Sequence, residues 1–335
     1  MTFLDEMKSA VTPRAALLVV GVLVLQWLFI ASYVGALHSP APKDVPFGVV
    51  APEQAAPRLV GRLDALPGGP LDPRTVAGAA EAHRQIMHRD LGGALIVDAH
   101  GREDTLLVAS GGGTVLSSAL TALIDRVEKG QQRTVRVVDV APASAQDFDG
   151  LSAFYLVVGW CVGGYLCASI LAISAGSRAA NGPRAVIRLA SMALYSIAGG
   201  LGGAVIVGPL LGALPGSVLG LWGLGALVVF SVGAITLALQ ALTGVVGIGL
   251  AVLLVVIGGN PSAGGAFPLQ MLPPFWRAIG PWLPPGAGTW VARSIAYFDG
   301  NAVTGPLLVL SGWAVVGTVI TLAMSTVRRR PAPAA

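Results

Sequence analysis

Few residues in this sequence are of types that do chemistry, and they do not form a catalytic motif. Asp98, His100 and Ser110 are the residue types of a hydrolase triad, but no G-x-S-x-G turn accompanies them. His83 and His88 are five positions apart, so they do not share a helix face well enough to bind a metal together. We therefore expect no enzyme activity, no cofactor and no metal site.

A glycine-rich stretch is a candidate for anion binding. Gly111-Gly112-Gly113-Thr114 opens a predicted helix, where free backbone N–H groups can hold an anion. It lacks the lysine and the spacing of a phosphate-binding loop, and the sequence contains no G-x-x-x-x-G-K-[ST] motif. A strand-to-helix turn is the simpler interpretation. Without the G-x-x-x-x-G-K-[ST] motif, this chain cannot hydrolyse nucleotide by the usual phosphate-binding loop.

The composition predicts a membrane protein. Apolar residues make up 54% of the sequence and charged residues only 11%, which is unlike a soluble domain. No Asp or Glu occurs from Gly150 to Phe298. Ion-driven carriers usually keep an acid within or beside a span, because a charge in lipid is costly and is kept for a purpose. The sequence therefore argues against coupling to an ion gradient. The net charge of +4 comes largely from short basic clusters beside apolar segments, so we expect no nucleic-acid partner.

Six apolar segments are long enough to cross a bilayer as helices. Residues 15–37 form the first, which we interpret as an uncleaved anchor because Ala36-Leu37-His38 makes a poor cleavage site for a signal peptide. Five more lie within residues 151–327: Leu151–Ala175, Leu189–Gly212, Val218–Gln240, Leu242–Gly258 and Thr304–Val327. The predicted fold class is therefore a membrane α-helical bundle of six transmembrane helices, with lipid as its surroundings.

Basic residues beside these spans predict the orientation. They form three clusters: Lys8 with Arg14, then Arg178, Arg184 and Arg188, and finally Arg328, Arg329 and Arg330. With six spans, all three clusters lie on one side, so both termini are expected in the cytoplasm. Residues 1–14 then form a cytoplasmic amphipathic N-terminus and residues 328–335 a cytoplasmic tail. Because Arg greatly outnumbers Lys and Ala and Gly are abundant, the composition indicates a high-GC bacterial genome, and hence the bacterial inner membrane.

Residues 38–150 predict an extracytoplasmic mixed α/β domain inserted between the first two spans. Its apolar patterns alternate between short strands and helices. The expected strands are Val45–Val50, Arg74–Ala77, Ala94–Asp98, Thr105–Ser110 and Thr134–Val140, with the third and fourth forming a hairpin. The expected helices are Arg58–Leu66, Ala79–Asp90 and Thr114–Lys129. Such a pattern favours a mixed sheet with helices on at least one face.

The segment 259–303 predicts a re-entrant or interfacial outer loop. Seven prolines interrupt it, so no long helix can run through it, and aromatic side chains favour the lipid headgroup boundary. Arginines in this setting can reach headgroups. The residues that we expect at this interface are Trp276, Arg277, Trp282, Trp290 and Arg293.

Glycine pairs recur in the predicted spans. Gly199 with Gly203 is one small-xxx-small pair, and such pairs allow helices to approach closely, either within one bundle or between subunits. Both interpretations stay open from the sequence.

The layout resembles a known family. One span and a large outer domain are followed by five further spans, and the outer loop before the last span contains FPLQMLPPFWRAIGPWLP from Phe267 and VARSIAYFDG from Val291. This pattern is similar to the type-2 ABC exporter permeases and their phage-infection-protein relatives. The resemblance implies a homo- or heterodimeric pore and a cytoplasmic loop, here Ser177–Arg188, that meets a separate cytoplasmic ATPase subunit. Arg178, Arg184 and Arg188 are then the candidate ATPase-coupling residues, although the same arginines also fit plain headgroup anchors.

Two functions follow from these observations. The first is a membrane permease subunit of an ABC-type exporter for a hydrophobic or amphipathic compound. The alternative is a non-transporting envelope scaffold, secretion accessory or phage-receptor-like protein that binds partners through its outer domain.

Overall fold

The computed structural model describes residues 12–176 and 179–327. Within them, five helices are long and apolar enough to cross a membrane, which makes the chain a multi-pass helical membrane protein, as its composition predicted. These helices are α2 (Pro13–Leu37), α6 (Ser152–Ala175), α7 (Gly182–Val205), α8 (Val218–Thr243) and α13 (Thr304–Val327). The terminal segments 1–11 and 328–335, for which we predicted a cytoplasmic N-terminus and tail, lie outside the described residues.

The predicted span Leu242–Gly258 corresponds to a shorter apolar helical segment, Val246–Ser262. It consists of α9 (Val246–Val252), the π-helical stretch η4 (Leu253–Gly259) and α10 (Asn260–Ser262). The segment packs against α2 through η4 and α10. By length it falls at the lower limit for crossing a bilayer. The described part of the chain thus has five candidate spans, and the sixth span remains a prediction.

Helix α7 starts earlier than the sequence predicted. The side chain of Asn181 caps the helix by accepting a hydrogen bond from the backbone N–H of Arg184, and Pro183 lies in its first turn. At its other end α7 continues into the π-helical η3 (Ile206–Leu210), which contains Pro209. Arg184 and Arg188 therefore lie on a helix rather than in a loop.

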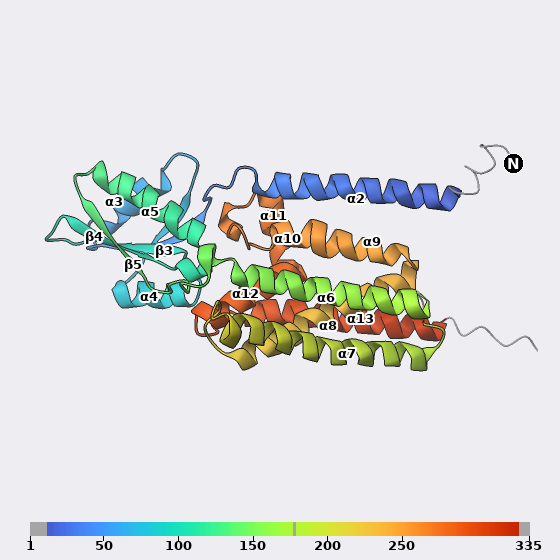
Figure 1. Ribbon diagram of the computed structural model, residues 1–335. Coiled ribbons are helices and arrows are strands. Elements are labelled where there is room, and N and C mark those ends of the chain that lie inside the picture. The colour runs from blue at the N-terminus through green and yellow to red at the C-terminus, as the bar shows by residue number, and fades with distance from the viewer. Residues whose placement is uncertain (1–11, 177–178, 328–335) are drawn as a thin grey trace, which may run out of the picture.

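Helix α8 is the centre of the bundle. It packs against α6, α7 and α13, and more of its apolar span is buried than in the other four candidate spans of the described residues. Glycine allows the closest approach between α7 and α8: a Cβ added at Gly200 would lie 2.5 Å from the backbone nitrogen of Ala226. By contrast, α2 lies along one edge of the bundle with most of its apolar side chains exposed, as expected for a helix that faces lipid (Figure 1).

Between α2 and α6 the chain forms a small five-stranded mixed sheet, which confirms the predicted mixed sheet. Its strands lie in the order β2-β1-β3-β4-β5, and only the β3–β4 pair is antiparallel. They are β1 (Val45–Val50), β2 (Leu71–Thr75), β3 (Gly93–Ile96), β4 (Glu103–Val108) and β5 (Thr134–Asp139). The antiparallel pair is the predicted hairpin.

Helices cover both faces of this sheet. In Figure 1, α3 (Ala56–Asp64) and α5 (Thr114–Lys129) lie on one face and α4 (Ala79–Met87) on the other. Alternate residues of β1, from Val45 through Phe47 to Val49, are buried against α3 and α5. Met271 of the outer loop is a buried member of the same core and Phe267 packs against it, so the α/β domain does not complete its core alone.

The α/β domain lies at one end of the bundle, and the C-terminal end of α6 and the start of α7 lie at the other (Figure 1). The outer loop forms the contact with the domain. After α10 it contains four more short elements, η5 (Leu269–Met271), α11 (Pro274–Ile279), η6 (Gly280–Trp282) and α12 (Pro284–Tyr297). These interruptions agree with the predicted effect of the prolines.

Candidate functional site

Helix α12 joins the α/β domain to the bundle. Two prolines open it, where their missing N–H groups cost nothing, and Asp299 and Gly300 follow it with positive φ angles of 53° and 76°. The helix packs against α6, α8 and α13 on the bundle side and against η1 (Ser110–Gly112) of the domain. Most of its residues are therefore buried, and its polar side chains make specific contacts.

Arg89 of the domain contacts α12 directly. It follows α4 with a positive φ of 63°. Its guanidinium carbon lies 3.4 Å from the ring centroid of Trp290 and 4.8 Å from that of Phe298. Its Nη1 donates to the carbonyl of Trp290 at 2.8 Å and to Oγ of Ser294 at 2.9 Å. These are cation–π and hydrogen-bonding contacts to neutral partners only.

Arg293 lies one turn along the same helix and is buried, with 3% of its surface exposed. It donates to three backbone carbonyls, those of Gly264 at 2.6 Å, Gly265 at 2.7 Å and Gly150 at 3.0 Å. Its Nε is buried without a hydrogen-bond partner. Arg293 thus ties the outer loop to the start of α6 and keeps one donor unused.

Tyr297 completes the junction at the C-terminal end of α12. Its hydroxyl donates to Oδ2 of Asp147 at 2.6 Å and accepts from the backbone N–H of Ser144 at 3.5 Å. The Asp147 carboxylate also accepts from the N–H of Ser152 at 2.7 Å, at the first turn of α6. The segment that leaves the sheet is therefore fixed to both α12 and α6.

A cavity of about 640 Å³ lies between the domain and the outer loop. Leu91, Leu116 and neighbouring residues of the domain line one side. The outer loop, α12 and the first turn of α13 at Thr304 to Pro306 line the other. Arg89, Arg277 and Arg293 all contribute to its wall, whereas none of the described lining residues is an acid. The volume lies within the usual range of about 300–1,000 Å³ for ligand sites.

The ionisable side chains that line this cavity in the described residues are all arginines. Burial lowers the pKa of Arg89 well below its usual range, and repulsion from the Arg293 charge lowers it further. Arg277 differs, because it has an acidic partner: its Nη1 lies 3.4 Å from Oδ2 of Asp44 and 3.0 Å from the carbonyl of Lys43. The site therefore contains two close cations that share no described acidic counterion in the cavity wall.

The five predicted outer residues separate into two groups. Arg277, Trp290 and Arg293 line the cavity. Trp282 is 69% exposed, its carbonyl accepts from the indole N–H of Trp313, and Trp276 forms an edge-to-face pair with Phe275. The structure thus brings three of the five residues together and leaves the two remaining tryptophans outside the cavity.

Two of the three predicted coupling arginines, Arg184 and Arg188, lie at the opposite end of the bundle from this site (Figure 1). Arg178 lies outside the described residues. Arg184 is exposed in the first turn of α7, whereas Arg188 is buried and donates to the carbonyls of Ala175 at 2.8 Å and Gly176 at 2.7 Å. Arg188 therefore closes the C-terminal end of α6, and Arg184 is the described arginine that is free to meet a partner.

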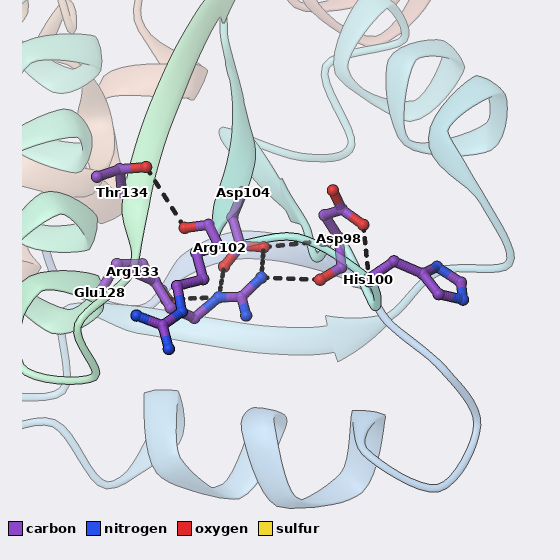
Figure 2. Close-up of polar contacts among 7 residues, drawn as sticks. All are labelled: Asp98, His100, Arg102, Asp104, Glu128, Arg133 and Thr134. Atoms are coloured by element: carbon purple, nitrogen blue, oxygen red, sulfur yellow. Dashed lines mark hydrogen bonds and ion pairs between the residues drawn. The ribbon is translucent and has the colours of Figure 1, made fainter.

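A second polar cluster lies in the α/β domain (Figure 2). None of its residues lines the cavity. Arg133 donates two hydrogen bonds, of 2.7 and 2.6 Å, to the carboxylate of Asp104, and its Nε lies 3.8 Å from Glu128. Burial raises the pKa of Glu128 to about 7, repulsion from Asp104 contributes in the same direction, and Arg133 opposes it. The cluster holds β4, β5 and the end of α5 together.

Asp98, His100 and Ser110, which are the residue types of a hydrolase triad, make local contacts to the backbone. Asp98 accepts from the backbone N–H of His100 at 2.9 Å, and Oγ of Ser110 accepts from the N–H of Ala143 at 2.8 Å. Within residues 12–176 and 179–327, no group of three or more His, Cys, Asp or Glu residues has a metal-binding arrangement.

Sequence reasoning missed Arg89, Ser294, Tyr297 and Asp147 as members of the junction. Arg89 follows a predicted surface helix, where an arginine is ordinary, so its sequence neighbourhood contains no signal for burial. Tyr297 belongs to the quoted outer-loop pattern, which was the available hint. Comparison with known proteins adds no candidate, because no family model, no curated protein and no solved structure matches this chain.

Proposed function

We propose that this chain is the membrane permease subunit of an ABC-type exporter for a hydrophobic or amphipathic compound, powered by a separate ATPase. Its proposed setting is the bacterial inner membrane, with six spans, both termini in the cytoplasm and the α/β domain outside. The arginine clusters support this orientation, and the outer-loop resemblance supports the family.

The observation that carries the proposal is the cavity between the α/β domain and the bundle. It combines apolar walls with cationic groups, and it reaches the start of α13, one of the candidate spans. In the proposed orientation, the cavity lies at the extracytoplasmic surface of the inner membrane. A compound with an apolar part that leaves the bilayer there would meet both kinds of surface at once.

The energy source must come from outside this chain if it transports. The sequence has no nucleotide-binding loop, and the five candidate spans contain no Asp or Glu. Arg184 is the exposed described residue that we expect to contact an acidic surface of the ATPase.

The experiment is charge reversal followed by co-purification. Arg184→Glu should abolish crosslinked co-purification of an ATPase while leaving membrane insertion normal. Arg58→Glu, at an exposed position on α3 in the α/β domain, makes the same charge change and should have no effect. If the wild-type protein captures no ATPase under crosslinking, the exporter proposal fails.

One observation favours the alternative, a non-transporting envelope scaffold or secretion accessory. Arg188 donates its hydrogen bonds to backbone carbonyls at the end of α6, so it acts as a structural residue and has few groups left to contact an ATPase. Crosslinking that captures secretion or envelope proteins through the α/β domain, and no ATPase, would support the scaffold.

A further inference from the structure

The cavity between the α/β domain and α12 has the features of a binding site for one class of ligand. Its acid-free wall includes Arg89, whose hydrogen bonds go to neutral groups, whereas Arg293 has the charge of Asp147 nearby. Buried cations in proteins are normally paired with an anion, because an unpaired charge loses its hydration. An anionic group in this cavity would supply the missing counter-charge.

Arg89 is the better placed of these two cations. All three hydrogen bonds of Arg293 go to backbone carbonyls, and these hold the loop in place. The hydrogen bonds of Arg89 to α12 use Nη1 alone, and its side chain is only partly buried where it lines the cavity. The ring of Trp290 fixes the guanidinium plane, so that its remaining N–H groups are preorganised for an incoming carboxylate or phosphate.

The rest of the cavity requires an apolar ligand. Ile86, Leu91, Leu116 and Leu269 line it, and its apolar surface exceeds its polar surface. A small hydrophilic anion would leave these side chains in contact with water, whereas an alkyl chain would cover them. Because the wall extends to Pro306 at the start of α13, such a chain can continue toward the membrane.

We propose that this cavity binds a single-chain anionic amphiphile, with its carboxylate or phosphate on Arg89 and its alkyl chain along the apolar wall. The volume of about 640 Å³ fits one such molecule rather than a multi-chain lipid. The inference deepens the proposed function by naming a substrate class, and it rests on that function only for the transport step.

The test measures binding to the purified full-length chain in a neutral detergent. The probe is tritiated oleoyl lysophosphatidate, and the matched neutral probe is oleoylglycerol, which has the same chain without the phosphate. We expect saturable binding of lysophosphatidate and binding of oleoylglycerol that is at least about tenfold weaker, because a charge-assisted hydrogen bond is lost. Inorganic phosphate at millimolar concentration should not displace the lipid.

Substitutions at two positions, Arg89 and Ala109, separate the effect of charge from the effect of cavity shape. Arg89→Gln should weaken lysophosphatidate binding about tenfold or more, whereas Arg89→Lys, which retains the charge, should lose less. Ala109→Leu keeps every charge and narrows the cavity, so it should also weaken binding even if Arg89→Gln loosens the domain. Arg58→Gln is the matched control, because that arginine is exposed on α3 and does not line the cavity.

Equal affinity for the neutral and anionic probes, with no effect of Arg89→Gln, would overturn the proposal. Complete displacement by inorganic phosphate would also overturn it, because the site would then recognise a small anion. These measurements need no ATPase, so a failed co-purification and a failed binding assay are distinguishable results.

Discussion

Glu128 allows a sharp test of how the α/β domain is held together. Its carboxyl group is buried beside Asp104, with Arg133 bonded chiefly to Asp104 and 3.8 Å from Glu128 (Figure 2). Replacing Glu128 with glutamine removes the negative charge and keeps a group that can donate to Asp104. The variant therefore imitates the protonated form of the wild-type side chain.

The sign and size of the effect follow from the pKa of Glu128. Burial and the Asp104 charge raise this pKa from 4.5 to about 7, so the folded protein holds the proton more tightly than the unfolded chain. The stabilisation from that proton is complete below about pH 4.5, declines as the pH rises and is lost above about pH 7. At about 1.4 kcal/mol for each pH unit, and with solvent screening near the domain surface, it amounts to about 2 kcal/mol.

Hydrogen exchange of the full-length protein measures this difference locally. Peptides from α5 and β5 are compared between wild type and Glu128→Gln at the same pH, so that intrinsic exchange rates cancel. At about pH 8 the variant should be protected about 30-fold more strongly, and at about pH 4 the ratio should approach one. Glu53→Gln, at an exposed turn position, is the control and should leave protection unchanged at both pH values.

Two results would refute the reasoning. A protection ratio that does not change with pH would show that Glu128 does not titrate in this range. Weaker protection of the variant at about pH 8 would show that the ionised carboxylate stabilises the domain through Arg133 more than its burial costs.

Three further predictions concern topology, domain autonomy and the junction. In a background without native cysteines, a cysteine at Gly101 should react with an impermeant reagent in intact cells and one at Asn181 should not; the reverse would overturn the orientation. A fragment spanning residues 45–140 should fold alone but be about 2 kcal/mol less stable to urea than the same domain in the full chain, because it lacks Met271; a molten product would mean that the domain depends on the bundle. Arg293→Met should lower the melting temperature in detergent by leaving three carbonyls unpaired, at a cost of about 3 kcal/mol or more, and an unchanged melting temperature would contradict that role.

The sequence predicted the elements well where the physical cause is local. A long apolar run predicts a membrane helix without reference to its neighbours, and five of the six predicted spans, the first anchor included, have matching long helices in the described residues. The mixed sheet followed from short alternating runs between turns. The segment Val246–Ser262 was harder to assign, because its length falls between that of a span and that of a buried helix.

The glycines also show that a sequence pattern can predict close helix packing without identifying the residue that makes the contact. A Cβ at Gly199, part of a predicted small-xxx-small pair, would meet nothing within 4 Å, whereas one at the adjacent Gly200 would contact α8. A shift of one residue turns a helix face by about 100°. The pattern therefore indicated close helix packing but did not determine which glycine makes it.

By itself the sequence determined that the chain enters a membrane, that acids are excluded from its spans, and that Trp290 and Arg293 belong to an unusual loop. Only the tertiary structure decided that Arg89, about 200 positions earlier in the chain, stacks on Trp290 and shares a cavity with Arg293. Hydropathy and turn propensity act over neighbouring residues, so sequence patterns report them. A cavity and its charge arise from contacts between distant segments, and no local pattern records that Arg89 will lie beside Arg293 in the fold.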